Sequence, residues 1–160
     1  MNNLHRVYLS LGSNIDPEIN LPKAVTLLRQ HGRIPSVSSA WESHAIGARG
    51  PNFLNAVVLL FAAFELEDIK PLLIQPVEDA LGRARSDDKF APRTMDIDTI
   101  LYDGNPQKLD CWEYAYVICP MAELLPDLQH PMTQQKMSVA AQQAQQQAWI
   151  IRRLDILLDQ

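Results

Sequence analysis

Two aspartates stand one residue apart in an apolar run, at Asp96 and Asp98, and Arg93 precedes them by three positions. On a strand, side chains two residues apart point to the same face, so this spacing places the two carboxylates side by side. Adjacent carboxylates repel each other unless a cation neutralises them, and Mg²⁺ suits such a pair because water and phosphate oxygens complete its shell. Because Arg83 and Arg85 lie just upstream, the pattern predicts a metal–nucleotide site.

An aspartate pair with this spacing also occurs by chance on solvated strands, where it has no function. Here Ile97 separates the two aspartates and Ile100 and Leu101 follow them, which is typical of a buried strand. Buried carboxylates without a partner are rare because removing a charge from water is costly. The apolar flanks therefore favour a functional pair.

Length, composition and charge limit the classes of protein to be considered. The chain has 160 residues, 47% hydrophobic and 21% charged, which suits one globular domain spanning residues 1–160. The net charge of −5 argues against a nucleic-acid partner, and the lack of an apolar run of eighteen residues argues against a membrane span. The N-terminus lacks a signal-peptide pattern, so we expect a cytoplasmic protein whose oligomeric state stays open.

Cysteine and histidine residues do not form a recognisable metal motif. Cys111 and Cys119 lack the spacing of metal ligands, and cytosolic chains rarely form disulfides, so we expect two packed thiols. The four histidines are scattered along the chain, and His44 is interpreted as a solvated loop residue.

Hydrophobic periodicity predicts a series of strands and helices. Strands are expected over residues 6–11, 34–42, 53–64, 95–102 and 112–119. The first helix should run from Asn20, as its cap, to residue 31; a second should span 67–81, with a kink at Pro76. Residues 134–147 are compatible with a helix, and residues 149–158 fit a helix or a strand equally well.

The order strand–helix–strand–strand–helix–strand predicts the α+β class. It matches a ferredoxin-like split βαβ sandwich, in which helices pack on one face of a mostly antiparallel sheet.

Several motifs, taken in order, resemble those of the hydroxymethyldihydropterin pyrophosphokinase family of folate biosynthesis. They are LGSN at 11–14, PNFLNA at 51–56, Gln75 with Glu78, GRAR at 82–85 and APRTMDID at 91–98. The last of these is highly specific, whereas the LGSN turn alone would be a weak signal. The resemblance covers about residues 5–128 and leaves 129–160 as a C-terminal extension that we expect to pack on the domain.

The resemblance implies an ATP- and Mg²⁺-dependent transferase. Enzymes of this family move a pyrophosphoryl group from ATP to the hydroxymethyl group of 6-hydroxymethyl-7,8-dihydropterin and release AMP. By resemblance, Asp96 and Asp98 bind two Mg²⁺ ions and act in catalysis together with Arg83 and Arg93.

The resemblance also assigns residues to the two substrates. The nucleotide side would comprise Gln75, Glu78, Arg83, Arg85, Arg93, Thr99 and Lys108. The pterin side would comprise Ser43, Ile46, Phe53, Asn55, Phe90 and Tyr116. A flat heteroaromatic ring needs stacking partners and a polar edge, and an asparagine amide carries both a donor and an acceptor. Without the resemblance, the aromatic residues would be interpreted as core.

This chain departs from the family pattern in the segment that follows the aspartates. The family has a longer hairpin there, with a histidine that contacts the nucleotide, whereas residues 105–113 contain no histidine. A family arginine falls at Tyr114, a proline pair falls at His44 and Ala45, and Lys108 is the cation left in the segment. Weaker ATP binding is expected as a result.

Three functions therefore remain open from the sequence. The first is an active pyrophosphokinase with a trimmed nucleotide loop. The second is a paralogue that binds pterin or nucleotide with weak or no transfer, and the third is a ferredoxin-like phosphotransferase acting on another small alcohol. The fold alone cannot separate them.

Overall fold

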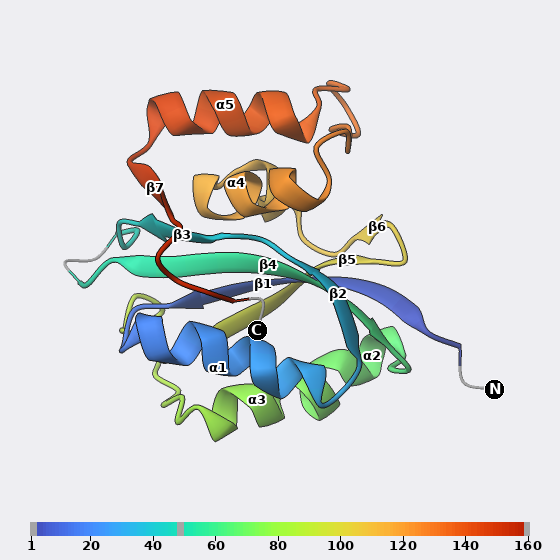
Figure 1. The fold of residues 1–160 in the computed structure, drawn as a ribbon, viewed down its shortest axis with the longest axis vertical. Helices are drawn as coiled ribbons and strands as arrows, with labels where there is room; N and C mark the ends of the chain where they lie inside the picture. The colour runs from blue at the N-terminus through green and yellow to red at the C-terminus, as the bar shows by residue number, and fades with distance from the viewer. Residues whose placement is uncertain (1–2, 48–49, 159–160) are drawn as a thin grey trace.

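The computed structural model describes residues 3–47 and 50–158, in which seven strands and several helices alternate (Figure 1). The strands are β1 (His5–Ser13), β2 (Arg33–Val37), β3 (Ala40–Ser43), β4 (Phe53–Ala62), β5 (Asp96–Tyr102), β6 (Asn105–Pro106) and β7 (Ile150–Arg153). The helices are α1 (Pro17–Arg29), α2 (Leu66–Asp68), α3 (Gln75–Ala80), α4 (Ala115–Leu124) and α5 (Met137–Gln147).

The strands form one antiparallel sheet in the order β6-β5-β1-β4-β3-β7, with β2 also paired to β4. β1 and β4 are the longest strands and lie at the centre, as expected for the most apolar segments. The positions of β5, β1, β4 and the β2–β3 pair are those of a split βαβ unit. The predicted ferredoxin-like α+β class is confirmed.

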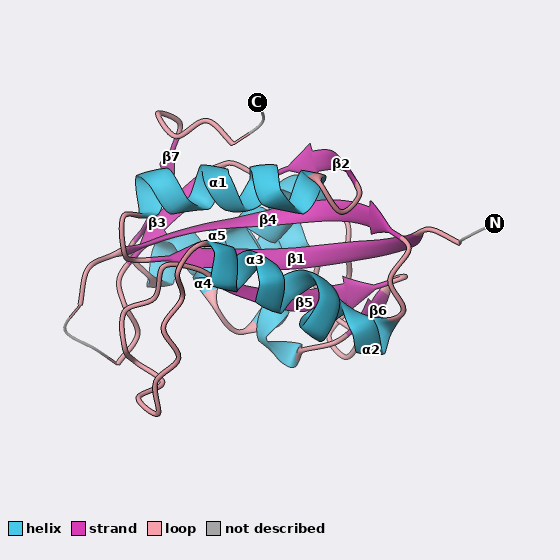
Figure 2. Cartoon of the chain, turned by 90° about the horizontal axis from the view of Figure 1, so that it is seen from below, coloured by secondary structure: helices cyan, strands magenta, loops and turns pink. Residues whose placement is uncertain are grey.

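Helices cover both faces of the sheet, so the expectation of helices on one face is wrong. α1, α2 and α3 lie below the sheet in Figure 1, and α4 and α5 lie above it; Figure 2 shows the same arrangement from below. Alternation along the strands divides the core accordingly: Leu9 and Val58 belong to the lower cluster, and Tyr8 and Val57 to the upper one. Each side of the sheet thus has its own core.

The strand predicted over residues 112–119 is wrong, because most of this apolar run forms α4. Val117, Ile118 and Cys119 are all buried in the upper core. A short run that is apolar on every side fits a buried helix as well as a buried strand, and periodicity cannot separate the two. A 3₁₀ turn, η2 (Leu109–Trp112), precedes the helix.

The other element predictions differ from the structure at the boundaries of the strands and helices. The strand expected over 34–42 is divided at Ser38 and Ser39, where the Glu123 carboxylate accepts hydrogen bonds from the backbone N–H and hydroxyl of Ser39. The first helix begins at Pro17 rather than after Asn20, since proline suits the first turn of a helix. The strand expected over 53–64 ends at Ala62.

The second helix, predicted over residues 67–81 with a kink at Pro76, consists of three consecutive segments, and its hydrogen-bond register changes just before Pro76. A π-helical segment, η1 (Ile69–Ile74), joins α2 to α3, and the N–H of Gln75 bonds to the carbonyl of Lys70. A π turn shifts the hydrogen-bond register by one residue. Proline has no N–H to donate, and the change of register falls directly before it.

The C-terminal segment is ordered and adds a strand to the sheet. Residues 137–147 form α5, as the composition allows, and β7 pairs with β3 in the register Ser43↔Ile150 to Ala40↔Arg153. Of residues 149–158, which fitted a helix or a strand equally well, residues 150–153 form a strand, and the others have no regular structure. Within the described part of the chain, no helix is long and apolar enough to cross a membrane.

The two cysteines are buried, as expected, and this has a measurable consequence. Burial, with a smaller effect of the Glu123 charge, raises the pKa of the Cys119 thiol to about 11. Only about one thiol in a thousand would then be ionised at pH 8, and the thiolate is the reactive form. We predict slow reaction of the native protein with an aromatic disulfide reagent at pH 8, and rapid reaction of two thiols per chain in denaturant. Rapid reaction of both thiols in the native protein would contradict this packing.

Candidate functional site

The two aspartates lie at the beginning of β5 and face the same side of the sheet. Asp96 pairs with Gly12 of β1 and Asp98 pairs with Ser10, and all four residues line one cavity. Ile97, between them, is 4% exposed in the lower core. The alternation predicted from the sequence therefore holds: the lower core anchors the strand, and both carboxylates reach the cavity.

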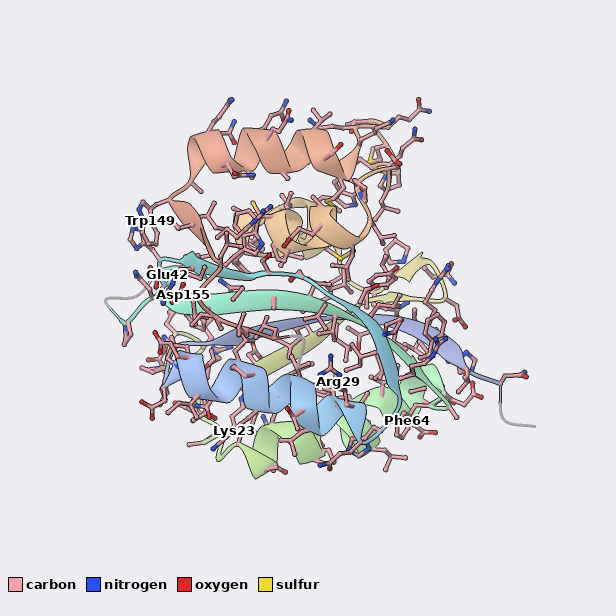
Figure 3. All side chains as sticks on the ribbon, in the orientation of Figure 1. Lys23, Arg29, Glu42, Phe64, Trp149 and Asp155 are labelled. Atoms are coloured by element: carbon pink, nitrogen blue, oxygen red, sulfur yellow. The ribbon has the colours of Figure 1, made fainter. Side chains whose placement is uncertain are left out.

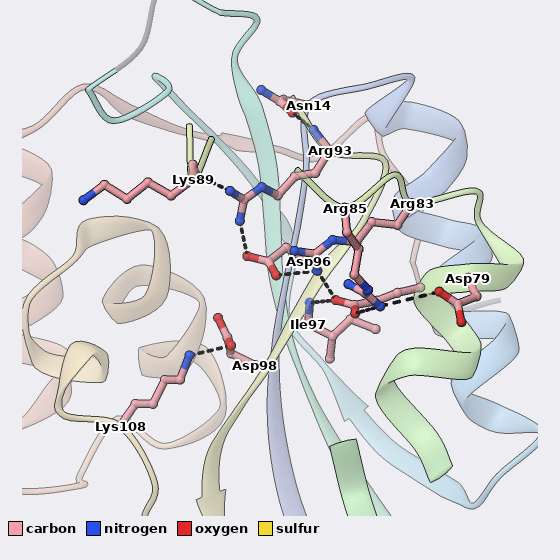
Figure 4. Close-up of polar contacts among 11 residues, drawn as sticks. Asn14, Asp79, Arg83, Arg85, Lys89, Arg93, Asp96, Ile97, Asp98 and Lys108 are labelled. Carbon is pink, nitrogen blue, oxygen red and sulfur yellow. Dashed lines mark hydrogen bonds and ion pairs between the residues drawn. The ribbon is translucent and has the colours of Figure 1, made fainter. Parts of the chain in front are cut away.

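Asp96 is held by two arginines (Figure 4). Its Oδ1 accepts a hydrogen bond of 2.9 Å from Nη1 of Arg83, and its Oδ2 accepts one of 2.8 Å from Nη1 of Arg93. Both arginines come from the segment between α3 and β5, which has no regular structure. The carboxylate therefore fixes two otherwise long and mobile cations beside the cavity.

A buried carboxylate, Glu78 on α3, positions Arg83. Glu78 is 3% exposed; its Oε2 lies 2.5 Å from Nη1 of Arg83 and accepts the N–H of Ile97 at 3.0 Å. Burial alone lowers the pKa of Arg83, but the charges of Asp96 and Glu78 outweigh it, so its pKa is raised and the guanidinium stays charged. Arg85 reaches the other oxygen of Glu78 at 3.3 Å. Glu78 thus links α3, the segment that carries Arg83 and Arg85, and β5.

Asp98 has a cation of its own. Nζ of Lys108 lies 2.6 Å from Oδ1 of Asp98, and both side chains are nearly half exposed. Lys108 follows β6, which turns back along β5, so the short hairpin delivers this lysine to the carboxylate. Three internal cations therefore neutralise the two aspartates.

The cavity beside the aspartates has a volume of about 300 Å³ and aromatic walls. The rings of Tyr114 and Tyr116 are stacked with centroids 5.2 Å apart, and Phe53 and Phe90 also line the cavity. Gly47 has φ +67°, and a Cβ there would lie 2.8 Å from the Phe90 ring. Only glycine lets the backbone at residue 47 approach the Phe90 ring so closely.

Asn55 and Ser43 are buried polar residues of this cavity, at 3% and 7% exposure. The contacts of Asn55 show what it can offer to a ligand. Its amide Nδ2 donates to the carbonyl of Trp41 at 3.2 Å and to Oγ of Ser43 at 2.8 Å. Both N–H groups are therefore committed to the protein, and the side-chain oxygen is the group that Asn55 can offer to a ligand. We expected Asn55 to supply both a donor and an acceptor; its N–H groups are bound within the protein, and the acceptor role stays a prediction.

The structure brings most of the predicted site residues to this one cavity. Those that line it are Ser43, Ile46, Phe53, Asn55, Phe90, Arg93, Asp96, Asp98 and Tyr116. Arg83 and Arg93 line an adjoining, more polar cavity of about 270 Å³. The two cavities share Lys89, Ala91 and Arg93 and thus lie side by side.

The remaining predicted residues lie around these cavities rather than in their walls. Glu78, Arg85 and Lys108 act on other site residues through the ion pairs described above. Thr99 pairs with Leu9, a lower-core residue, so its side chain lies on the face opposite Asp98. Gln75 lies at the first position of α3 and lines neither cavity.

Several residues that line the pocket were not predicted as site residues, and three of them carry a polar or aromatic side chain beside the site. Lys89 borders both cavities, and its carbonyl accepts a hydrogen bond from Nη2 of Arg93. Tyr114 stacks on Tyr116, and His44 lines the pocket rather than being merely solvated. Lys89 could have been found from its place beside Phe90, but His44 carried no signal of its own.

The chain is similar to known proteins over most of its length. Residues 8–126 match the model of the family described as 7,8-dihydro-6-hydroxymethylpterin-pyrophosphokinase. A Pseudomonas aeruginosa 2-amino-4-hydroxy-6-hydroxymethyldihydropteridine pyrophosphokinase is 32% identical over 140 residues, which cover 80% of this chain and 85% of the relative. An Aquifex aeolicus protein of the same name is 30% identical over 136 residues, covering 79% and 84%.

Solved structures support the fold alone, because their sequence identity is low. A Plasmodium falciparum HPPK-DHPS crystal structure superposes with a TM-score of 0.66 at 9% identity. The match covers 89% of this chain but only 45% of that longer protein. On the family match and the curated relatives, this chain belongs to the 7,8-dihydro-6-hydroxymethylpterin-pyrophosphokinase family.

Proposed function

We propose that this chain transfers a pyrophosphoryl group from ATP to the hydroxymethyl group of 6-hydroxymethyl-7,8-dihydropterin. The observation that carries the proposal is the position of Asp96 and Asp98, in the wall of an aromatic cavity that adjoins an arginine-lined one. In this reaction the hydroxymethyl oxygen attacks the β-phosphorus, the bond from that phosphorus to the α-phosphate bridge breaks, and AMP leaves. The use of ATP supports a cytoplasmic location.

The carboxylates fit divalent cations that arrive with the nucleotide. Among the described residues, no group of three or more His, Cys, Asp or Glu side chains could hold a metal ion alone. Two carboxylates with water and phosphate oxygens are a usual Mg²⁺ shell, so Asp96 and Asp98 would hold the two Mg²⁺ ions implied by the resemblance. When bound, Mg²⁺ would neutralise the phosphates and lower the pKa of the substrate hydroxyl.

The cations of the chain would bind and orient the phosphates. Arg83, Arg93 and Lys89 line the polar cavity, where they would hold the ATP phosphates in line with the acceptor. Glu78 is buried and bound to Arg83, so we assign it a positioning role rather than a nucleotide contact. Gln75, Arg85 and Thr99 stay predicted residues of the nucleotide side.

The aromatic cavity would bind the pterin ring. Tyr116 and Phe53 offer faces for stacking, and Oδ1 of Asn55 offers an acceptor for a ring N–H. Stacking fixes the plane of the ring, and the Asn55 contact fixes its rotation, so the hydroxymethyl group would point toward Asp96 and Asp98.

A paralogue without efficient transfer is the second candidate function. The ion pairs of Asp96 and Asp98 favour it, because bound metal must compete with Arg83, Arg93 and Lys108. One assay separates the two candidates: the purified chain is incubated with ATP, Mg²⁺ and the hydroxymethyldihydropterin, and products are separated by chromatography. We expect equal amounts of AMP and pterin diphosphate. Binding of both substrates without product would favour the paralogue.

Replacing a site carboxylate should abolish most turnover without unfolding the protein. For Asp96→Asn or Asp98→Asn we predict a fall in kcat of about a hundredfold or more, because metal-assisted charge stabilisation is worth several kcal/mol. The free energy of unfolding should change by less than about 1 kcal/mol for Asp98→Asn, whose ion pair with Lys108 is exposed, and by more for Asp96→Asn, whose two ion pairs are partly buried. Steady-state kinetics and chemical denaturation measure the two effects.

Asp103→Asn is the matched control for these variants. Asp103 follows β5 and forms an ion pair of 2.7 Å with His5, but it lines neither cavity. It should keep parental turnover. Parental turnover of the Asp96 or Asp98 variant at saturating Mg²⁺ would refute the metal role.

Removing the Asn55 side chain should weaken the binding of the pterin far more than the binding of the nucleotide. Asn55→Ala should weaken pterin binding about five- to 150-fold, since leaving a buried hydrogen-bonding group without its uncharged partner costs about 1–3 kcal/mol. Binding of a non-hydrolysable ATP analogue should change less than twofold. Calorimetric titration of both ligands tests this, and an equal loss for both would make Asn55 a structural residue.

Lys108 should make a modest, salt-sensitive contribution to nucleotide binding. We predict that Lys108→Ala weakens binding of the ATP analogue by less than about tenfold, and less so at high salt, because the lysine is a half-exposed point charge. Lys136→Ala, at an exposed pair with Asp127, is the control. Analogue affinity unchanged by Lys108→Ala at low salt would show that the arginines hold the nucleotide without it.

A further inference from the structure

The C-terminal segment reaches the pterin-side cavity through one aromatic contact. The rings of His44 and Trp149 are stacked with centroids 4.2 Å apart and an interplanar angle of 12°. His44 lines the cavity, whereas Trp149 stands just before β7 and is 42% exposed. Trp149 also lies outside residues 8–126, which match the family model.

β7 is fastened firmly to the strand that leads into the cavity. Arg153 donates to Oε1 of Glu42 at 2.7 Å, and the Arg152 guanidinium lies 5.1 Å from the centre of the Trp41 ring. Figure 3 shows Trp149, Glu42 and Asp155 near one end of the sheet. Arg153 also binds Asp155 at 2.8 Å, and Trp149 directly precedes the strand that these contacts hold.

β3 passes this constraint to the residues of the cavity wall. Ser43, the last residue of β3, pairs with Ile150 and accepts the hydrogen bond from Asn55. His44 follows directly, and its Nδ1 lies 3.0 Å from Oδ1 of Asn52. His44 is therefore held by Trp149 on one side and by Asn52 on the other.

We propose that Trp149 is a positioning residue for the substrate pocket. By stacking on His44, Trp149 fixes the beginning of the loop that follows β3. This loop start is part of the cavity wall that would hold a flat heteroaromatic substrate. This inference rests on the proposed function, because the ligand of the cavity is taken to be the pterin. It gives the C-terminal strand a role in substrate binding besides completing the sheet.

An aromatic pair of this kind sets the size of the expected effect. Loss of one stacked contact should weaken pterin binding about two- to tenfold, if the loop must be ordered again when the ligand binds. The arginine-lined cavity is built from other segments, so nucleotide binding should be unaffected.

Three variants test the proposal: Trp149→Ala, Trp149→Phe and the control Ile151→Ala. Phenylalanine keeps a ring for stacking, and Ile151 is an exposed apolar residue of the same strand, at 45% exposure. Hydroxymethyldihydropterin is titrated calorimetrically in the presence of Mg²⁺ and a non-hydrolysable ATP analogue. We expect the Kd for pterin to rise two- to tenfold in Trp149→Ala and to change less than twofold in the other two variants. Steady-state kinetics of Trp149→Ala should show a raised KM for pterin and an unchanged kcat.

A double-mutant cycle with His44→Ala separates stacking from loss of bulk. If the two rings act as one unit, the double variant should bind pterin no worse than either single variant. Near-ultraviolet circular dichroism should show the same loss of signal in both single variants, which also reports on folding.

The outcomes also distinguish this inference from the proposed function. Failure of the parent chain to bind the pterin would overturn the proposed function itself. Parental pterin affinity in Trp149→Ala would overturn only the positioning role. Equal weakening of pterin and ATP-analogue binding, or additive losses in the double variant, would also overturn it.

Discussion

The balance of charge at the start of β5 governs the whole site. Asp96 and Asp98 lie on one face of the strand, and Arg83, Arg93 and Lys108 neutralise them. Without cations, the two adjacent carboxylates would repel each other, and without the carboxylates the three clustered cations would do the same. The internal ion pairs thus balance the charge of the site, and in the proposed reaction a metal–nucleotide complex would replace them.

The two cores of the molecule hold this charged cluster in place. The lower core anchors β5 through Ile97, and the same strand presents its aspartates toward the side of the sheet that α4 and α5 cover. Glu78 extends the support, since one buried carboxylate bonds the backbone of β5 and the guanidinium of Arg83. The aromatic residues that precede and begin α4 then close the cavity.

Local sequence was sufficient wherever periodicity or spacing decided the structure. The spacing of Asp96 and Asp98 correctly placed both on one face, and the order of elements gave the ferredoxin-like topology. The resemblance added Asn55 and the aromatic residues around it. Periodicity failed where a segment is apolar on all sides, as in α4, and where hydrogen bonding changes register, as in η1 before Pro76.

Contacts between distant segments could not be predicted from the sequence. The stack of His44 on Trp149 joins residues far apart in the chain, and nothing in either neighbourhood indicates the other. Glu78 fitted a nucleotide contact until its burial and its bond to Ile97 were known. Roles set by tertiary packing require the structure, whereas roles set by strand alternation do not.

The coupling between metal and nucleotide is the most direct test of the account. The affinity of a non-hydrolysable ATP analogue is measured with and without Mn²⁺, in the parent and in Asp98→Asn. Because Asp98 would hold a metal ion that neutralises the phosphates, we predict that Mn²⁺ tightens analogue binding at least about tenfold in the parent and much less in the variant. Analogue binding that Mn²⁺ leaves unchanged, or tightens equally in both proteins, would contradict the account.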